Sequence, residues 1–484
     1  MELELAADME TVAGLSRMKA LTACRDGRPR TQSVKIVWHD SPDHALLADG
    51  LTLAEQRGVR RVERVYPGAE TWLPAQPVPV VADPAELPSP LAPLAAFEGR
   101  QASSVHRFGD QSVTITVARG ILRSVTAEQP VARIWLNGED QAVWSAAVLI
   151  AGAGTVAVPA ASLAAEGIAL ATGRTVARRH EGAPILPTGS PSVIDALTHI
   201  MGHLTDVILA YAPVAVRPDS QGVEAVHQMR VAVRRARSAV SIFRSAVSDG
   251  ALDAVGDRLK DLGVRLGPTR DWDVFADETM PALREALPDD ERLERLSAAA
   301  SRQRQACRKA LAAYLASPAF RLLGIELAWF ASAGAWHAPP PVASEGEATE
   351  PPTLTAFAGP VLQHRWKKLV SLGKRIEELD VASLHGVRLR AKRARYAAEM
   401  FSPLHQGKTA SRFIRRLSVL QQRLGILNDG AVATHLLAEL GGPSGRHAYA
   451  AGLVVGFLAA RSAKIRPRIV QAFEKFRRQP AFWG

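Results

Sequence analysis

One stretch of sequence occurs twice at a fixed distance and decides the fold of the C-terminal three-fifths of the chain. VHQMRVAVRRAR at residues 226–237 corresponds to LHGVRLRAKRAR at residues 384–395, which lie 158 residues later. The same offset, without a gap, matches Phe243, Arg258, Leu262, Arg265, Leu266, Gly267, Asp271 and Val274 with Phe401, Arg416, Leu420, Arg423, Leu424, Gly425, Asp429 and Val432. So many matches at one offset predict an internal duplication.

Each copy of this stretch predicts a helix with one apolar face and one cationic face. At about 100° per residue, the cations of the first copy fall within an arc of about 80°, and apolar residues occupy the arc beside them. We call these two sets of cations the first basic stripe, formed by His227, Arg230, Arg234 and Arg237, and the second basic stripe, formed by His385, Arg388, Lys392 and Arg395.

Like charges at helical spacing repel, by a few tenths of a kcal/mol per pair. No acidic residue lies inside either stripe to relieve this repulsion. A solubilising helix face usually mixes both signs of charge, so the stripes indicate a binding surface for a polyanion, and arginine suits phosphate oxygens in particular. Arg258 with Arg265, and Arg416 with Arg423, lie seven residues apart and are weaker candidates on a second helix of each half.

Composition agrees with a localised basic surface. The 484-residue chain has a net charge of +11. Residues 1–189 hold 18 Lys and Arg against 20 Asp and Glu, so all of the excess charge lies in the remainder. Two isolated cysteines exclude a disulfide framework and a thiolate metal site. The N-terminus has no secretory signal pattern, and the longest apolar stretch, residues 448–460, is shorter than a membrane span, so we expect a soluble, cytoplasmic protein.

The sequence pattern divides the chain into domains. Residues 1–180 carry short β-prone runs at 34–38, 112–117 and 131–136, with a Pro/Ala-rich loop at 67–93, and predict an α+β domain. Residues 181–191 form a linker. Residues 192–484 have helical periodicity and predict an all-α domain with repeat one at 192–337, a linker at 338–352 and repeat two at 353–484.

Two residue types in the duplicated region have alternative roles. His227 and His385 have no His or carboxylate at i+3 or i+4, so they are read as phosphate donors or structural residues, and we expect no metal site and no cofactor. His199 and His203 lack the intervening carboxylate of a zinc protease and are read as core or surface histidines. Asp271 and Asp429 are expected to cap a following helix, the alternative being to orient an arginine of the stripe.

The two intact copies of His-x2-Arg-x3-Arg/Lys-Arg-x-Arg, each followed by Leu-Gly-x3-Asp, resemble the CHAD family, the conserved histidine α-helical domain. The resemblance covers roughly residues 190–484. It implies two four-helix bundles related by a pseudo-twofold axis, with the basic helices facing a positively charged pore that binds inorganic polyphosphate. The cations that match are those of the two basic stripes, with Arg258, Arg265, Arg416 and Arg423 as the weaker candidates.

The N-terminal region resembles a degenerate CYTH domain, the triphosphate tunnel fold, and this implies a β-barrel. Glu2-Leu-Glu4-Leu-Ala6 lies where that family has E-x-E-x-K, and residues 40–43 with 50–53 resemble its D-T-P-D and G-x-x-L segments. Ala6 replaces the lysine, LAEQ at residues 53–56 stands where basic residues are expected, and VARIW at 131–135 replaces the later acidic strand. Because triphosphate hydrolysis needs clustered carboxylates and a ring of cations, we predict no triphosphatase activity.

The sequence therefore predicts a non-enzymatic protein that binds inorganic polyphosphate. Three alternatives stay open: triphosphatase activity of the N-terminal domain, general binding of polyanions such as nucleic acid, and association with polyhydroxyalkanoate granules. Nucleic acid is disfavoured because the stripes contain no aromatic residue for base stacking. Localisation on polyphosphate or polyhydroxyalkanoate granules is compatible with the prediction.

Overall fold

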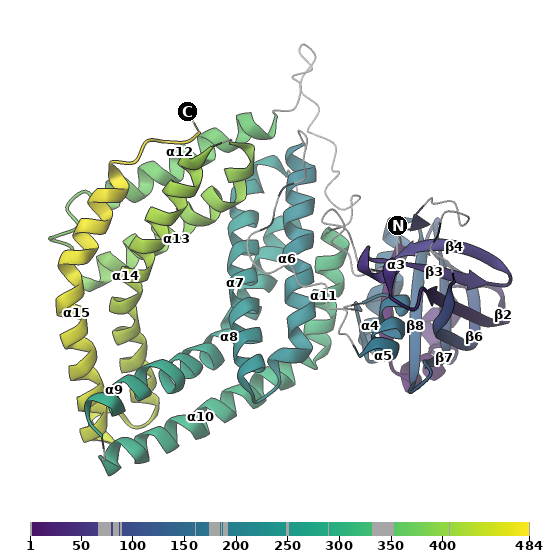
Figure 1. The fold of residues 1–484 in the computed structure, drawn as a ribbon, viewed down its shortest axis with the longest axis horizontal. Coiled ribbons are helices and arrows are strands. Elements are labelled where there is room, and N and C mark those ends of the chain that lie inside the picture. Colours follow the sequence, from purple (N-terminus) through teal and green to yellow (C-terminus); the bar gives the residue numbers. More distant parts are fainter. Residues whose placement is uncertain are drawn as a thin grey trace. The chain divides into compact units, whose positions relative to one another are not determined.

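The structure is a computed structural model, and it folds into two compact units (Figure 1). It describes residues 2–65, 79–80, 87, 90–159, 161–173, 184, 186, 192–247, 251–288, 290–331, 353–405 and 407–483. The first unit consists of Met1–Glu181, Met201–Pro213 and Tyr314–Ala338, and the second of Gly182–Ile200, Val214–Ala313 and Pro339–Gly484. The linker predicted at 338–352, almost all of that predicted at 181–191 and most of the loop predicted at 67–93 lie outside the described residues.

The first unit is built on one antiparallel sheet with the strand order β5-β4-β3-β2-β6-β7-β8-β1-β9. The β-prone runs of the sequence fall in three of its strands, as predicted. The strands are β1 (Glu2–Ala7), β2 (Arg25–Asp40), β3 (Leu51–Gln56), β4 (Val59–Arg64), β5 (Pro79–Val80), β6 (Ala92–Phe108), β7 (Gln111–Arg123), β8 (Glu128–Gly138) and β9 (Val156–Ala157).

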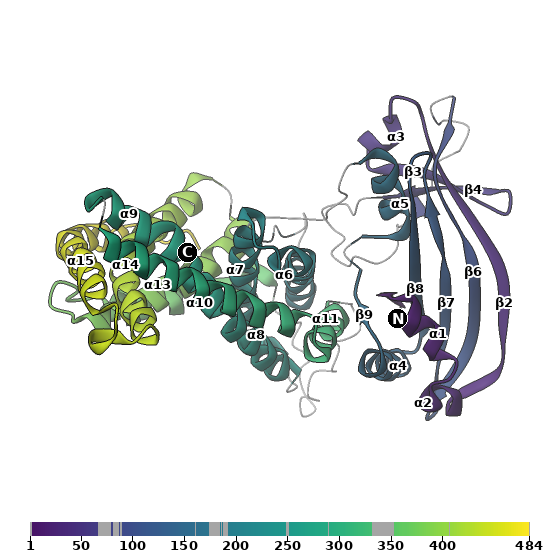
Figure 2. The same cartoon turned by 90° about the horizontal axis from the view of Figure 1, so that it is seen from below.

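The expected closed barrel is wrong, because this sheet is open. Its outermost strands, β5 and β9, have two residues each and pair with β4 and β1, not with each other. A barrel needs every strand hydrogen-bonded on both edges around a closed ring. Here helices cover the faces of the sheet instead, so apolar side chains are buried without closure (Figure 2).

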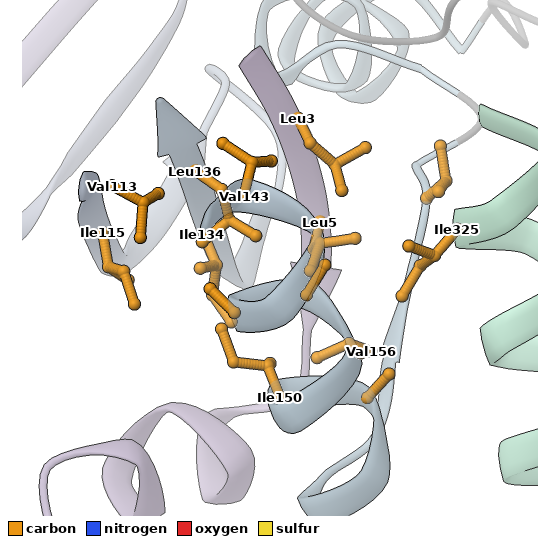
Figure 3. Close-up of a cluster of buried hydrophobic side chains, with 14 of the residues drawn as sticks. Leu3, Leu5, Val113, Ile115, Ile134, Leu136, Val143, Ile150, Val156 and Ile325 are labelled. Carbon is orange, nitrogen blue, oxygen red and sulfur yellow. The ribbon is translucent and has the colours of Figure 1, made fainter. Parts of the chain in front are cut away.

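One face of the sheet packs against helices that include two which are far apart in the sequence. Alternate residues of β1, β7 and β8, including Leu3, Ile115 and Leu136, point to this face, as the two-residue period of a strand requires. They contact α4 (Asp140–Ala153) and also Ile325 of α11 (Pro318–Phe330) (Figure 3). Trp144 and Trp329 add a ring contact at 5.4 Å. The predicted division at residue 192 assigns α11 to the helical domain, whereas α11 completes the core of the first unit.

The opposite face of the sheet bears a second apolar cluster and a cavity. Trp38, Phe97 and Leu122 are buried there against α5 (Leu163–Thr172). Ser162 caps α5, its side chain accepting a hydrogen bond from the Ala165 N–H. The first unit also has three short helices: α1 (Met9–Leu15) and α2 (Lys19–Ala23), which add Val12 and Leu21 to the apolar cluster beside α4, and α3 (Ala45–Ala48).

From residue 192 onward the described chain contains helices and no strand, which confirms the all-α prediction for this region. The α-helices are α6 (Val193–Ala215), α7 (Ser220–Phe243), α8 (Ala251–Val274), α9 (Met280–Ala286), α10 (Glu291–Leu315), α11, α12 (Leu354–Leu372), α13 (Val381–Phe401), α14 (Lys408–Glu439) and α15 (Ala448–Arg477). A π-helical turn, Phe275–Thr279, joins α8 to α9.

The C-terminal ends of α7 and α13 keep the 158-residue offset of the sequence, whereas the starts of these helices do not. α7 ends at Phe243 and α13 at Phe401, and each continues into a short 3₁₀ turn, Arg244–Ala246 and Ser402–Leu404. Asp219 and Asp380 cap the starts of α7 and α13 by accepting backbone N–H bonds. The predicted four-helix bundles and their pseudo-twofold axis stay a prediction.

Within the second unit, apolar side chains of the two halves meet in two separate clusters among the described residues. At one, the rings of Phe243 and Phe401 lie 6.1 Å apart, and Phe357 of α12 stacks on Phe243 at 5.2 Å. At the other, α8, α9 and α10 of the first half form one apolar core with α14 and α15 of the second half. The halves are therefore tied at separated points along their helices.

Two described helices, α6 and α15, are long and apolar enough to cross a membrane, judged by length and composition; a bent α10–α11 pair would make a third. The expectation of a protein without a membrane span stays a prediction.

Candidate polyanion-binding surface

The helices α7 and α13 bury their apolar faces and leave the basic stripes partly accessible. The buried positions of α7 recur at helical spacing, and His227, Arg230 and Arg234 of the same helix are only partly covered. In α13 the same division separates buried Leu384, Val387 and Ala391 from the second stripe. Arg237 and His385 are the most exposed members of their stripes.

Four cations from the two stripes converge, and we call them the central cation cluster: Arg230, Arg234, Arg388 and Lys392. Burial lowers the pKa of Arg230, and Arg234 and Arg388 lower it further, against the opposing effect of Asp271. Burial also lowers the pKa of Arg388, and Arg234 of the other half adds to this effect. The two halves therefore bring like charges close together.

The strongest electrostatic effect in the cluster falls on Lys392. Burial, followed by the charges of Arg388, Arg234 and Arg230, lowers the pKa of Lys392 to about 7. A lysine pKa falls this far where the charged form lacks both water and counter-charge. The Nε atoms of Arg234 and Arg388 are likewise buried without a hydrogen-bond partner among the described residues. The cluster thus holds buried guanidinium nitrogens that have no hydrogen-bond partner among the described residues.

Asp271 lies inside α8 rather than at its start, so the predicted helix cap is wrong. Its Oδ1 atom lies 3.7 Å from Nη2 of Arg230. Gly267, one helical turn earlier, faces the same guanidinium, because a Cβ atom there would lie 3.1 Å from Arg230 Nη1. In the first half, the Leu-Gly-x3-Asp motif therefore makes room for a stripe arginine and places a carboxylate beside it, whereas a Cβ atom at Gly425 of the second half would meet no contact within 4 Å among the described residues.

The helix cap predicted for Asp429 in the second half is wrong as well, because Asp429 lies inside α14. Burial raises its pKa, and Arg388 opposes this change. Burial likewise raises the pKa of Asp271 against the effect of Arg230. Asp271 thus forms an ion pair with the second residue of the first stripe, and Asp429 acts electrostatically on the second residue of the second stripe, which favours the alternative role that the sequence left open.

His227 and His385 lie beside positions that correspond in the two halves, but the residues at these positions differ. His385 Nδ1 lies 2.9 Å from Oδ1 of Asn428. The corresponding position beside His227 is Arg270; burial and then this arginine lower the pKa of His227. His199 and His203 are buried in α6, as core histidines.

Not every arginine of α7 and α13 is available to a ligand. Nη2 of Arg235 lies 3.1 Å from Oε2 of Glu399, which joins α7 to α13. The other oxygen of Glu399 lies 3.4 Å from Nε of Arg395, and Arg395 also donates to the Ser418 hydroxyl at 3.4 Å. Glu399 therefore compensates one end of the second stripe from its own helix, just beyond the motif.

A cleft of about 770 Å³ continues from the central cation cluster along α7, α8, α12 and α13. Arg234, Arg237 and Lys392 of the stripes line it. Further cations that the sequence reasoning missed line it as well: Arg244, Lys260, Arg365 and Arg393. Asp253 and Asp257 are the acids among its lining residues. Lys260 could have been found from its spacing: it follows Gly256 by one helical turn, and Gly256 lies on the side of α8 that faces α7.

Comparison with known proteins identifies this region. Residues 199–438 match the family of the CHAD domain. This part of the chain is a CHAD domain. The crystal structure of the CHAD domain from the plant Ricinus communis is similar over 63% of this chain and 97% of that chain, with 29% identity and a TM-score of 0.51. PptA from Streptomyces chartreusis aligns over 59% of this chain and 100% of that chain, with 18% identity and a TM-score of 0.43. No curated protein matches the sequence.

The four arginines that the sequence offered as weaker candidates are not gathered at the central cation cluster. Gly256, Gly263 and Gly267 mark the side of α8 that faces α7, and Arg258 and Arg265 lie about 200° around the helix from the first two. Arg416 Nε is buried without a hydrogen-bond partner among the described residues. Arg423 donates to the backbone carbonyl of Arg468 on α15. The structure therefore gathers the stripes but disperses these four arginines.

Within the part of the chain that the structure describes, no group of three or more His, Cys, Asp and Glu side chains is placed to hold a metal ion. Cys307 is partly buried, and burial raises the pKa of its thiol.

Proposed function

We propose that the CHAD domain binds inorganic polyphosphate without catalysing a reaction, through the basic stripes of α7 and α13. The observation that carries the proposal is the convergence of Arg230, Arg234, Arg388 and Lys392 from the two halves. A chain of phosphates supplies closely spaced negative charges, and it can neutralise several of these cations at once. The resemblance of the duplicated motif narrows the class of polyanion to polyphosphate.

The basic cleft supports a ligand longer than a single phosphate. Its cations follow α7 from Arg234 to Arg244 and are joined by Lys260 and Arg365 from neighbouring helices. A linear polyanion that occupied the cluster would reach this cleft, because Arg234 and Lys392 belong to both. Tyr396 is the single aromatic residue among the lining residues, so base stacking contributes little to such a surface.

The test is a titration of long-chain polyphosphate and of DNA, at equal phosphate concentration, into the full chain and a variant in which the four cluster cations are alanine. A matched control changes four exposed cations elsewhere, Arg302, Lys309, Lys374 and Lys475, and so alters the net charge equally. We expect the cluster variant to lose at least 100-fold in affinity for polyphosphate and the control variant less than 5-fold. Equal losses of affinity in the two variants would mean that net charge, and not the central cation cluster, determines binding. Equal affinity of the full chain for DNA and for polyphosphate would contradict a site that is specific for polyphosphate.

For the N-terminal unit we infer that tripolyphosphate is not hydrolysed. The cavity on its sheet is lined by the carboxylates of Glu2, Glu4 and Glu63 and by one cation, Arg61, among its described lining residues. Three carboxylates repel a triphosphate that a single arginine cannot neutralise. Release of phosphate from tripolyphosphate in the presence of Mg²⁺ or Mn²⁺ would overturn this inference.

A further inference from the structure

The cavity of the N-terminal unit has the character of a small-molecule site. It measures about 560 Å³ and lies on the sheet face opposite to α4, where alternate residues of the strands point into it. Trp38, Phe97 and Trp135 contribute aromatic walls, and Leu163 of α5 closes one side. Cavities of this size with apolar walls and a few polar groups are the usual form of a ligand pocket.

The charged groups among the described lining residues of this cavity are three carboxylates and one guanidinium, and two of the carboxylates are almost fully buried. Glu4 and Glu63 are 1% and 3% exposed. Glu4 lies 3.1 Å from Nε of Arg133, whose guanidinium also contacts Glu166. Glu63 accepts a hydrogen bond from Arg61 Nε. With Glu2, the cavity and its supporting ion pairs hold four carboxylates and two guanidinium groups.

The buried carboxylates are short of positive charge. Burial raises the pKa of Glu4 to about 7, although Arg133 opposes the change. Burial also raises the pKa of Glu63, against the effect of Arg61. A cation inside the cavity would restore the missing charge and lower both pKa values.

We propose that this cavity binds a small organic ammonium ion, which is held between the aromatic walls and the carboxylates of Glu2 and Glu63. An ammonium group is attracted to the face of an indole ring and to carboxylate oxygens, and its carbon atoms suit the apolar wall. A bare metal ion fits less well, since no group of three ligating side chains is placed to hold one in the described part of the chain. A phosphate ligand would meet net negative charge.

This site is independent of the CHAD domain, because it belongs wholly to the first unit. The test is isothermal titration of spermidine, choline and tripolyphosphate into the full chain and into three variants. Glu63→Gln keeps the shape of the side chain and removes its charge, and Trp135→Leu removes one aromatic wall. Glu98→Gln is the matched control, since Glu98 lies on the same sheet with ion pairs to Lys35 and Arg123 and does not line the cavity.

We expect the full chain and Glu98→Gln to bind at least one of the two ammonium probes with equal affinity. Glu63→Gln and Trp135→Leu should each weaken it by 10-fold or more while circular dichroism and the melting temperature show a folded protein. If Glu63→Gln does not fold, the partly exposed Trp135 position still decides the question. The proposal is overturned if neither probe binds, if all four proteins bind alike, or if Trp135→Leu abolishes binding of tripolyphosphate instead.

Discussion

Arg235 of the first half and Glu399 of the second half form an ion pair in which Nη2 and Oε2 lie 3.1 Å apart and both side chains are 14% exposed. Glu399 also faces Arg395, so its removal leaves two largely buried guanidinium groups without their carboxylate. Breaking such a pair costs more than the pair itself contributes. We expect Glu399→Ala to lower the free energy of unfolding by about 2–4 kcal/mol, measured in urea.

The control for this change is Glu378→Ala, whose carboxylate is 57% exposed beside Arg375. Exposed ion pairs contribute about 0–1 kcal/mol. A cost for Glu399→Ala as small as that of the control would contradict a tie between α7 and α13 at this point.

The contact between Phe243 and Phe401 predicts equal sensitivity in the two halves. Both rings are fully buried. Truncation of either to alanine should cost about 3–5 kcal/mol, because it opens a cavity in the same aromatic cluster. In the double variant the losses should not add, since the rings are in contact. Additive losses would show that the two positions stabilise the protein separately.

Lys392 predicts that polyphosphate binding depends on pH. In the free protein its pKa is about 7, so the side chain is partly neutral at pH 7. A bound polyanion raises this pKa, and binding therefore takes up a proton. Affinity should fall as the pH rises from 6 to 9. In Lys392→Arg, which keeps its charge over this range, the profile should be flatter. Parallel profiles for the two proteins would assign the pH dependence to other groups.

The same lysine predicts a pH dependence of stability. In the unfolded chain its pKa returns to 10.5, so between about pH 7 and pH 10.5 the unfolded chain binds the additional proton. Stability contributed by this residue therefore rises with pH across that window and is lowest below pH 7. Lys392→Met should raise the melting temperature more at pH 6.5 than at pH 9. A larger gain at pH 9 would contradict the lowered pKa.

Asp271 beside Arg230 predicts a gain of affinity on substitution. Asp271→Asn keeps the shape of the side chain and removes a partly buried negative charge next to the central cation cluster. We expect a 3- to 10-fold gain in affinity for polyphosphate at low salt, and a smaller gain in higher salt because screening weakens the effect. Glu378→Gln changes the net charge equally at an exposed position and should leave the affinity within 2-fold. A loss of affinity in Asp271→Asn would mean that Asp271 contributes more by orienting Arg230 than its negative charge costs.

The sequence predicted the helical fold and the two stripes because both depend on local periodicity. The predicted barrel was wrong, because closure depends on whether two distant edge strands meet, and β5 and β9 are too short to do so. The role of Asp271 was missed for a related reason. A Leu-Gly pair suggests a helix end, but here Gly267 lies within α8 and makes room for a guanidinium from another helix.

Ile325 and Ala328 of α11 lie in the core beneath the sheet, although α11 follows α10 in the chain and precedes the second half of the duplication. A shortened protein that began at residue 192 would expose this apolar face of α11 to water. Such a fragment should aggregate or bind detergents, whereas one in which Ile325, Ala328 and Trp329 are replaced by polar residues should stay in solution. Production of the helical region by itself therefore requires redesign of the apolar face of α11, and residues 201–213 of α6 also belong to the first unit, so a cut placed at the linker alone is not enough.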